Sequence, residues 1–133
     1  MTVIICLDDN NGMAFNKRRQ SRDSKVMENI RELFGEPIHI APYSEKIFRT
    51  AGLEYTVCAD PASSKDGVLF VETFDPALLA DCTDRLVIYR WNRLYPADLC
   101  CTLDLSGFHR GESVEFVGSS HEKITREIFE KIE

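Results

Sequence analysis

Features that would identify a membrane span or a secretion signal are absent from this sequence. No apolar run approaches the roughly 18 residues that a membrane-spanning helix requires. The N-terminus reaches Asp8 after a short hydrophobic stretch that lacks a basic start. We therefore expect a cytoplasmic protein that has no membrane partner.

Motifs for metal binding and nucleophilic catalysis are also lacking. His39, His109 and His121 stand far apart, with no His-x-His, His-Glu-x-x-His or spaced cysteine pair, so the sequence predicts no metal site. There is no Gly-x-Ser-x-Gly elbow and no glycine-rich phosphate loop. His121 follows Ser119 and Ser120, as in a nucleophile and base pair, but in a turn such a histidine is more often exposed, and that is our expectation.

Net charge and cysteine number exclude two further classes of protein. The formal net charge is -6, so the averaged field repels phosphate backbones and we predict no nucleic-acid partner. The 5 cysteines are odd in number and mostly lie in apolar runs. This pattern favours reduced thiols packed in the core over a disulfide framework.

What is present indicates an α/β domain. The 133 residues are 44% hydrophobic, enough for one core, and we predict a single domain over 1–133. Val3–Leu7 and Val68–Val71 are continuous apolar runs typical of strands buried on both faces. Asp23 can cap a following amphipathic helix, and Arg85–Trp91 is a further strand. Alternating strands and helices favour a sheet with parallel neighbours.

The last third of the chain allows two readings. Ser113–Val117 alternates between apolar and polar residues, as a strand does, and Gly118 to Ser120 form a turn. The segment Lys123–Ile132, taken by itself, favours a helix, because Ile124, Ile128, Phe129 and Ile132 share a helical face. Ser119 and Glu122 would then form its capping box.

The order of these elements resembles dihydrofolate reductase. Val3–Leu7 followed by DDNNGMAFN resembles the first strand and the substrate-covering loop of that family. In chain order, Gly35–Ile40 then resembles the family's Gly-Lys-Pro-Val-Ile-Met, and Ser44–Phe48 resembles the helix that follows it. Cys82–Trp91 resembles the central strand, and Asp98 matches the Asp of a Gly-Asp-Thr turn. The C-terminal hairpin is matched by Asp104–Phe108, Glu115-Phe116 and Ser120–Glu130. The resemblance implies an α/β fold with a mixed sheet of about seven strands, flanking helices and a C-terminal antiparallel hairpin, with a strand as the last segment.

The resemblance implies NADPH binding, but the sequence departs from the family where NADPH phosphates bind. The family's Gly-Arg-x-Thr turn reads Ala41–Ser44 here: the arginine is missing, Pro42 has no amide hydrogen, and only Ser44 is left as a phosphate ligand. The family's Gly-Gly turn becomes Val71–Thr73, whose glutamate repels phosphate. The segment between Phe48 and Val68 is also shorter than the family's adenosine-binding strands require. We expect no cofactor, with NADPH held through Ser44 as the alternative.

The substrate side of the resemblance is altered as well. The carboxylate that the family places on its first helix overlays on Lys25, and the nearest acid is Asp23. We expect Asp23 to cap the helix; the alternative, if the loop is one or two residues shorter, is that it replaces the family's carboxylate. Where the family closes its loop with an apolar residue and a tryptophan, Arg19, Gln20 and Ser21 stand here.

The opening loop itself has two interpretations. In one, it is a surface turn held by Asx hydrogen bonds, with Gly12 at a positive φ. In the other, it is the edge of a binding site, because ligands of α/β sheets usually sit at strand ends, and Arg18, Arg19 and Asp98 converge on one cleft.

We therefore predict a degenerate, shortened dihydrofolate reductase-like domain that has lost NADPH-dependent reduction and binds a small anionic or polar ligand in the former substrate cleft. The alternatives are an NADPH-dependent reductase of a pterin or another flat heterocycle, and a structural or homo-oligomeric module without a ligand. No catalytic residue is predicted, and whether the chain is an enzyme stays open. The predicted ligand-binding residues are Arg18, Arg19, Gln20, Asp23, Tyr89 and Asp98.

Overall fold

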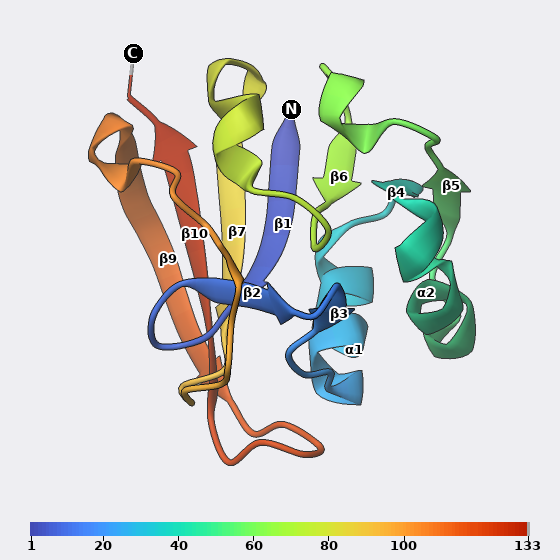
Figure 1. The fold of residues 1–133 in the computed structure, drawn as a ribbon, viewed down its shortest axis with the longest axis vertical. Coiled ribbons are helices and arrows are strands. Elements are labelled where there is room, and N and C mark those ends of the chain that lie inside the picture. Colours follow the sequence, from blue (N-terminus) through green and yellow to red (C-terminus); the bar gives the residue numbers. More distant parts are fainter. Residues whose placement is uncertain (133) are drawn as a thin grey trace.

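A mixed seven-stranded sheet forms the frame of the protein in the computed structural model, which describes residues 1–132 (Figure 1). Its strand order is β5-β4-β6-β1-β7-β10-β9. The first five strands in this order run parallel, and β10 and β9 form an antiparallel hairpin beside β7. Their bounds are β1 Thr2–Leu7, β4 Ile38–Ile40, β5 Tyr55–Val57, β6 Val68–Phe70, β7 Arg85–Arg90, β9 Phe108–Phe116 and β10 Ile124–Lys131. The predicted fold class is confirmed.

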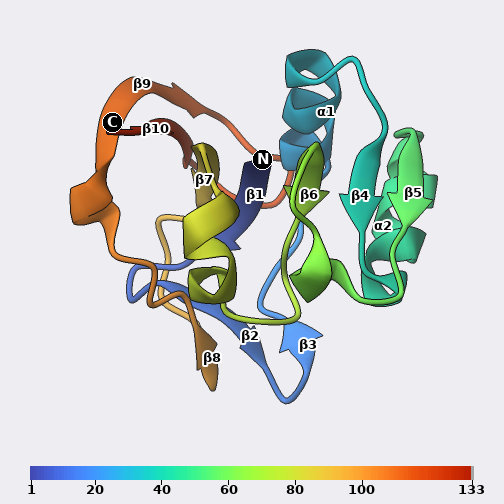
Figure 2. The ribbon, with the colours of Figure 1, turned by 90° about the horizontal axis from the view of Figure 1, so that it is seen from above.

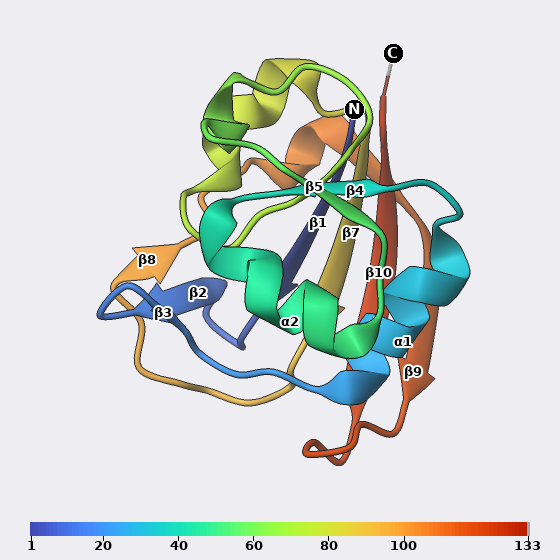
Figure 3. The same ribbon diagram turned by 90° about the vertical axis from the view of Figure 1, so that its right-hand side faces the viewer.

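The central strand β1 supplies apolar side chains to both faces of the sheet. Ile4 joins the core that lies under the helices α1 (Ser24–Leu33) and α2 (Glu45–Ala51). Val3 and Ile5 point into a second core, which includes Leu79 from the 3-10 helix Pro76–Cys82. A strand covered on both faces is expected to be apolar at successive positions, as this one is. Figure 3 shows α1 and α2 side by side against one face.

Helix α1 begins where the sequence predicts. Asp23 is in extended backbone conformation, and its side chain accepts a hydrogen bond from the Lys25 amide at 2.9 Å, which makes it the N-cap. Val26, Met27 and Ile30 form the buried face of the helix. Helix α2 follows a 3-10 turn over Pro42–Ser44 and packs beside α1.

The opening loop folds into a second, three-stranded sheet of β2 (Gly12–Phe15), β3 (Arg18–Arg19) and β8 (Leu99–Cys100). It lies on the side of the main sheet opposite α1 (Figure 2). The expectation that Gly12 has a positive φ was wrong, because Asn11, Asn16 and Lys17 take those conformations instead. Gly12 is required for close approach: a Cβ there would lie 2.5 Å from the Gln20 amide nitrogen.

The last segment is a strand, so the helical reading and its capping box were wrong. Ile124 and Ile128 are four residues apart, a spacing that places side chains on one face of a helix and also on one face of a strand. Both pack on the α1 side of the sheet, whereas Phe129, beyond a register shift in the pairing with β9, packs on the other side. Pairing with β7 and β9 satisfies the backbone on both edges, which decides between the two readings.

All five cysteines are free thiols. Cys6 and Cys101 pack against the two cores, but Cys100 is exposed, so the predicted core packing does not extend to it. Within residues 1–132, no helix is both long and apolar enough to cross a membrane. The same residues contain no group of three or more potential metal ligands close enough to hold an ion.

Candidate functional site

A cavity of about 470 Å³, here called the helix-side cavity, opens between α1, α2 and the ends of β1 and β6. The carboxyl ends of parallel strands are where ligands of α/β sheets usually bind. Serines, a threonine and Arg22 contribute polar groups to the lining. The apolar part of the wall is formed by Val26 and Met27 of α1, Ile47 and Ala51 of α2, Phe70 and Trp91.

One buried carboxylate on this cavity, Asp23, is saturated with hydrogen bonds. It accepts from the Lys25 amide, from the backbone amides of Ser119 and Ser120 at 2.8 and 2.9 Å, and from both of these serine hydroxyls. Its sixth partner is the His121 ring through Nδ1 at 2.9 Å. Burial raises the pKa of Asp23, but the hydrogen bonds from Ser120, His121 and Ser119 lower it more, so the pKa falls well below its ordinary value. Asp23 is therefore a charged helix cap and not a free ligand group.

The position of His121 corrects the prediction of an exposed turn residue, because the residue is only 5% exposed. Its ring stacks on Trp91, with 4.6 Å between ring centroids. The second nitrogen, Nε2, lies 3.0 Å from the Ser21 hydroxyl and 3.0 Å from the Tyr95 hydroxyl. The imidazole of His121 thus connects the turn between β9 and β10 to the cap of α1, through Asp23, and to the end of the opening loop, through Ser21.

Close approach of two chain segments makes this arrangement possible. Gly118 precedes the two serines, and a Cβ added to it would lie 2.4 Å from Asp23 Oδ2 and 2.8 Å from Ile124 Cδ1. Only a residue without a side chain allows the turn to approach Asp23 this closely.

A second carboxylate on the helix-side cavity, Glu72, is held by side chains. Arg19 donates to it through Nε at 2.9 Å and through a terminal nitrogen at 3.0 Å, a bidentate ion pair. The Ser44 hydroxyl donates to the same carboxylate at 2.6 Å. The Arg19 guanidinium also lies over the Tyr43 ring, 4.6 Å from its centroid.

The thiol of Cys6 also faces this cavity. Burial raises the pKa of Cys6 far above its ordinary value, and the charge of Glu72 raises it further. A thiol that stays protonated is a poor nucleophile, so Cys6 contributes an apolar surface and no thiolate chemistry.

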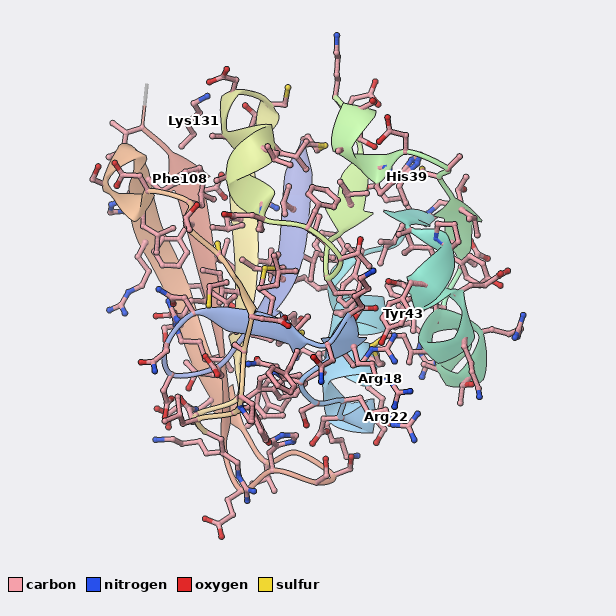
Figure 4. The ribbon with its side chains drawn as sticks, viewed as in Figure 1. Arg18, Arg22, His39, Tyr43, Phe108 and Lys131 are labelled. Atoms are coloured by element: carbon pink, nitrogen blue, oxygen red, sulfur yellow. The ribbon has the colours of Figure 1, made fainter. Side chains whose placement is uncertain are left out.

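Beyond Arg19 and Glu72 lies another cavity, the loop-side cavity, of about 580 Å³. Lys17, Arg18 and Asp98 line it, together with Arg19, Glu72 and Tyr43. Figure 4 labels Arg18 and Tyr43 here, and Arg22 near α1. Arg18, Arg19 and Asp98 therefore do meet at one cleft, and Arg19 and Glu72 stand between the two cavities.

No protein-family model and no curated protein matches the chain. Among solved structures, it is similar to dihydrofolate reductase from Enterococcus faecalis complexed with NADP(H) and RAB-propyl, with a TM-score of 0.66 and 10% sequence identity over 99% of this chain and 96% of that chain. The fold is dihydrofolate reductase-like. The resemblance drawn from the sequence is confirmed for the fold.

The sequence resemblance aligns the NADPH phosphate sites of the dihydrofolate reductase family with Ala41–Ser44 and Val71–Thr73, where the side chains of Ser44 and Glu72 are already bound to one another. The Ser44 side chain is fully buried, and its one hydroxyl hydrogen is donated to Glu72. The same resemblance aligns Glu72 with a glycine of the family, and Arg19 binds the Glu72 carboxylate at both oxygens. Pro42 offers no amide hydrogen.

The dihydrofolate reductase-like fold separates the predicted ligand-binding residues into four groups. Asp23 lines the helix-side cavity, Arg18 and Asp98 line the loop-side cavity, and Arg19 lines both. Gln20 and Tyr89 line neither of these cavities. Gln20 donates to the Asp8 carboxylate and to the Pro96 carbonyl. Tyr89 is fully buried, and its hydroxyl donates to Asn29.

The sequence places Ser21 in the altered lid but does not show its contact with His121, which also meets Trp91 and Tyr95. Ser21 and His121 are 100 residues apart in the chain, and no local motif connects them. The one available signal was the Ser-Ser-His stretch at 119–121, whose partner could not be identified without the fold.

Proposed function

We propose that this protein binds a small molecule with an apolar body and a polar or anionic end in the helix-side cavity, and that it does not bind NADPH in the manner of the family. The observation that supports the proposal is a cavity of ligand size at the strand ends, with an apolar wall and a cationic residue at its edge. Binding, not reduction, is the function that these residues favour.

The apolar wall would supply most of the affinity. Removing apolar surface from water contributes about 25 cal/mol per Å². A ligand that buries roughly 200 Å² of apolar surface would gain about 5 kcal/mol from the wall before the cost of immobilisation. A flat or branched hydrocarbon or an aromatic ring is the body that this wall suits.

The charge around the cavity favours a polar or anionic end. Glu72 is neutralised by Arg19, and the hydrogen bonds of Asp23 are already made by the protein. Arg22 is exposed and lines the cavity, and it makes no ion pair within the described part of the chain. A carboxylate, sulfonate or similar group would pair with this guanidinium.

Loss of the phosphate contacts argues against NADPH. Each charge-assisted hydrogen bond contributes about 1.5–3 kcal/mol, and two such losses weaken binding by roughly a hundredfold or more. The alternative, an NADPH-dependent reductase, would require the Arg19–Glu72 pair to open and release Ser44.

The test uses anilinonaphthalene sulfonate, which joins apolar rings to an anionic group and fluoresces when the rings leave water. We expect saturable binding to the folded protein. Ala51→Trp, which fills the wall, should abolish it, and Arg22→Ala should weaken it by about tenfold. Ala62→Trp, at an exposed position away from the cavity, is the matched control and should bind like the wild type.

Titration with NADPH tests the second half of the proposal. Trp91 is the only tryptophan and lines the cavity, so its emission reports occupancy and energy transfer to nicotinamide. We expect no saturable change at micromolar NADPH. Micromolar binding would contradict the proposal and favour the reductase. Failure of the sulfonate probe to bind, with a symmetric dimer in solution, would favour a structural module.

A further inference from the structure

Hydrogen bonds connect three side chains at the helix-side cavity: Ser21 and Asp23, which line it, and the buried His121 between them. The Ser21 hydroxyl is 3.0 Å from His121 Nε2, and His121 Nδ1 is 2.9 Å from Asp23 Oδ2. Ser21 and Asp23 both line the cavity. We propose that Ser21 is the nucleophile of an ester-hydrolysing site, with His121 as its base and Asp23 as the group that orients the base.

The direction of the hydrogen bonds suits this chemistry. Asp23 is ionised, so it can only accept, and His121 must donate to it from Nδ1. Nε2, the other ring nitrogen, then faces the Ser21 hydroxyl at 3.0 Å and is placed to take its proton. Trp91 stacks on the ring and fixes its plane, which leaves the imidazole little freedom to turn away.

The Tyr95 hydroxyl competes with Ser21 for the same nitrogen, because it also lies 3.0 Å from Nε2. Tyr95 does not line the cavity, whereas Ser21 does. A substrate in the cavity therefore meets the serine. Removing the tyrosine hydroxyl should release Nε2 to Ser21 and leave the reaction at least as fast.

The reaction requires only an ester and water. Ser21 Oγ attacks the ester carbonyl carbon while Nε2 takes the hydroxyl proton. The bond from that carbon to the alcohol oxygen breaks, the alcohol leaves with the proton from Nε2, and the acyl group stays on Ser21. A water molecule then gives a proton to Nε2 and attacks the acyl carbon, and the acid leaves as Oγ regains the proton.

The substrate class follows from the surroundings of Ser21. The apolar wall would hold the acyl chain, and a chain of a few carbons fits a cavity of about 470 Å³. Arg22 follows Ser21 directly and lines the same cavity, so its guanidinium is the cation available to the carbonyl oxygen as negative charge develops. This inference rests on the proposed function, because it requires the cavity to admit a small molecule.

The test is covalent labelling with an alkyl fluorophosphonate, followed by mass spectrometry of the intact chain and of its peptides. We expect one adduct per chain, on Ser21, and release of nitrophenol from nitrophenyl butyrate. Ser21→Ala should lower ester hydrolysis by roughly a hundredfold or more. Ser113→Ala, an exposed serine on β9, should react like the wild type, and Tyr95→Phe at least as fast.

Three results would overturn the inference: no labelling of the wild type, labelling on another serine, or unchanged hydrolysis in Ser21→Ala. Peptide mapping of the wild type decides even if a variant fails to fold. The sulfonate probe separates the two proposals. If the probe binds and Ser21 is not labelled, the cavity is a binding site and the hydrolytic site is refuted; if the probe does not bind, the proposed function fails as well.

Discussion

Asp23 and Glu72 are both nearly buried carboxylates on one cavity, 4% and 9% exposed, but the protein neutralises them in different ways. Asp23 is bound by backbone amides, hydroxyls and a histidine that belong to two distant segments. Glu72 is bound by one guanidinium and one hydroxyl. Backbone donors are fixed by the fold, whereas a guanidinium can move away.

This difference assigns the two carboxylates different roles. The Asp23 cluster, formed by Asp23 with Ser119, Ser120 and His121, joins α1 to the β9–β10 turn. Removing the Asp23 carboxylate would break this tertiary contact. The Arg19–Glu72 pair separates two cavities and can be replaced or opened with the fold intact. Variants at Asp23 and at the Arg19–Glu72 pair should therefore lower the free energy of unfolding by different amounts. They should also differ in whether a second substitution recovers the lost stability.

The largest effect is expected for Asp23→Ala. It removes the cap of α1 and leaves the partly buried amides and the buried His121 without their acceptor, so the free energy of unfolding should fall by about 3–5 kcal/mol. Urea denaturation measures this loss. Asp98→Ala, at an exposed carboxylate with one backbone partner, is the control and should cost less than about 1 kcal/mol. Equal losses would refute the anchoring role of Asp23.

Arg19→Ala should follow, because it leaves the Glu72 charge buried without a cation. We expect a loss of about 2–3 kcal/mol in the same measurement. The double variant Arg19→Met with Glu72→Met removes both charges and should recover much of this loss. If the losses measured for Arg19→Met and Glu72→Met singly simply add in the double variant, the pair is not coupled and the account of Glu72 is wrong.

Gly118→Ala tests the close approach to Asp23. The added methyl group would meet the Asp23 carboxylate, so we expect a loss of about 2 kcal/mol in the free energy of unfolding. Gly35→Ala is the matched control, since a Cβ there meets nothing within 4 Å. A variant at 118 as stable as the one at 35 would show that the turn can shift without disturbing the cluster.

Acidification should weaken the Asp23 cluster by a smaller amount. Since folding lowers the pKa of Asp23, its contribution to stability is present above the ordinary pKa of an aspartate and is lost as pH falls below it. Between pH 6 and pH 3 the stability advantage of the wild type over Asp23→Asn should shrink by about 1 kcal/mol. A constant difference across this range would contradict the charged state of Asp23.

The smallest effect is expected for Arg18→Ala. Arg18 is exposed and lines only the loop-side cavity. Its replacement should change the free energy of unfolding by less than about 0.5 kcal/mol and leave binding of the sulfonate probe unaltered. Isothermal titration of the sulfonate probe into Arg18→Ala and Arg22→Ala in parallel checks the binding. A larger loss of affinity in Arg18→Ala than in Arg22→Ala would indicate that the ligand binds in the loop-side cavity.

Much of the fold could be predicted because its signals are local. The apolar run of Val3–Ile5 indicates a strand covered on both faces, and Asp23 before an amphipathic stretch indicates a helix start. The last strand could not be predicted from its pattern, since the four-residue spacing between Ile124 and Ile128 fits one face of a helix and also one face of a strand. Pairing with β7, which lies far away in the sequence, decides it.

The candidate site was less predictable because its contacts are distant in sequence. Arg19 and Glu72 are 53 residues apart and Asp23 and His121 are 98 apart. The sequence identifies Arg19 as part of an altered lid and Glu72 as a group that repels phosphate, but nothing local shows that they neutralise one another. The convergence of Arg18 and Asp98 could be anticipated only through the family's chain order.

The central claim is that the helix-side cavity, and not the loop-side cavity, is the ligand site. Backbone amide chemical shifts recorded during titration with anilinonaphthalene sulfonate test it directly, because each cavity has its own set of amides. The account predicts saturable shifts at Val26, Met27, Ala51 and Trp91, with Lys17, Arg18 and Asp98 unaffected. Shifts confined to Lys17, Arg18 and Asp98, or no saturable shifts at all, would contradict it.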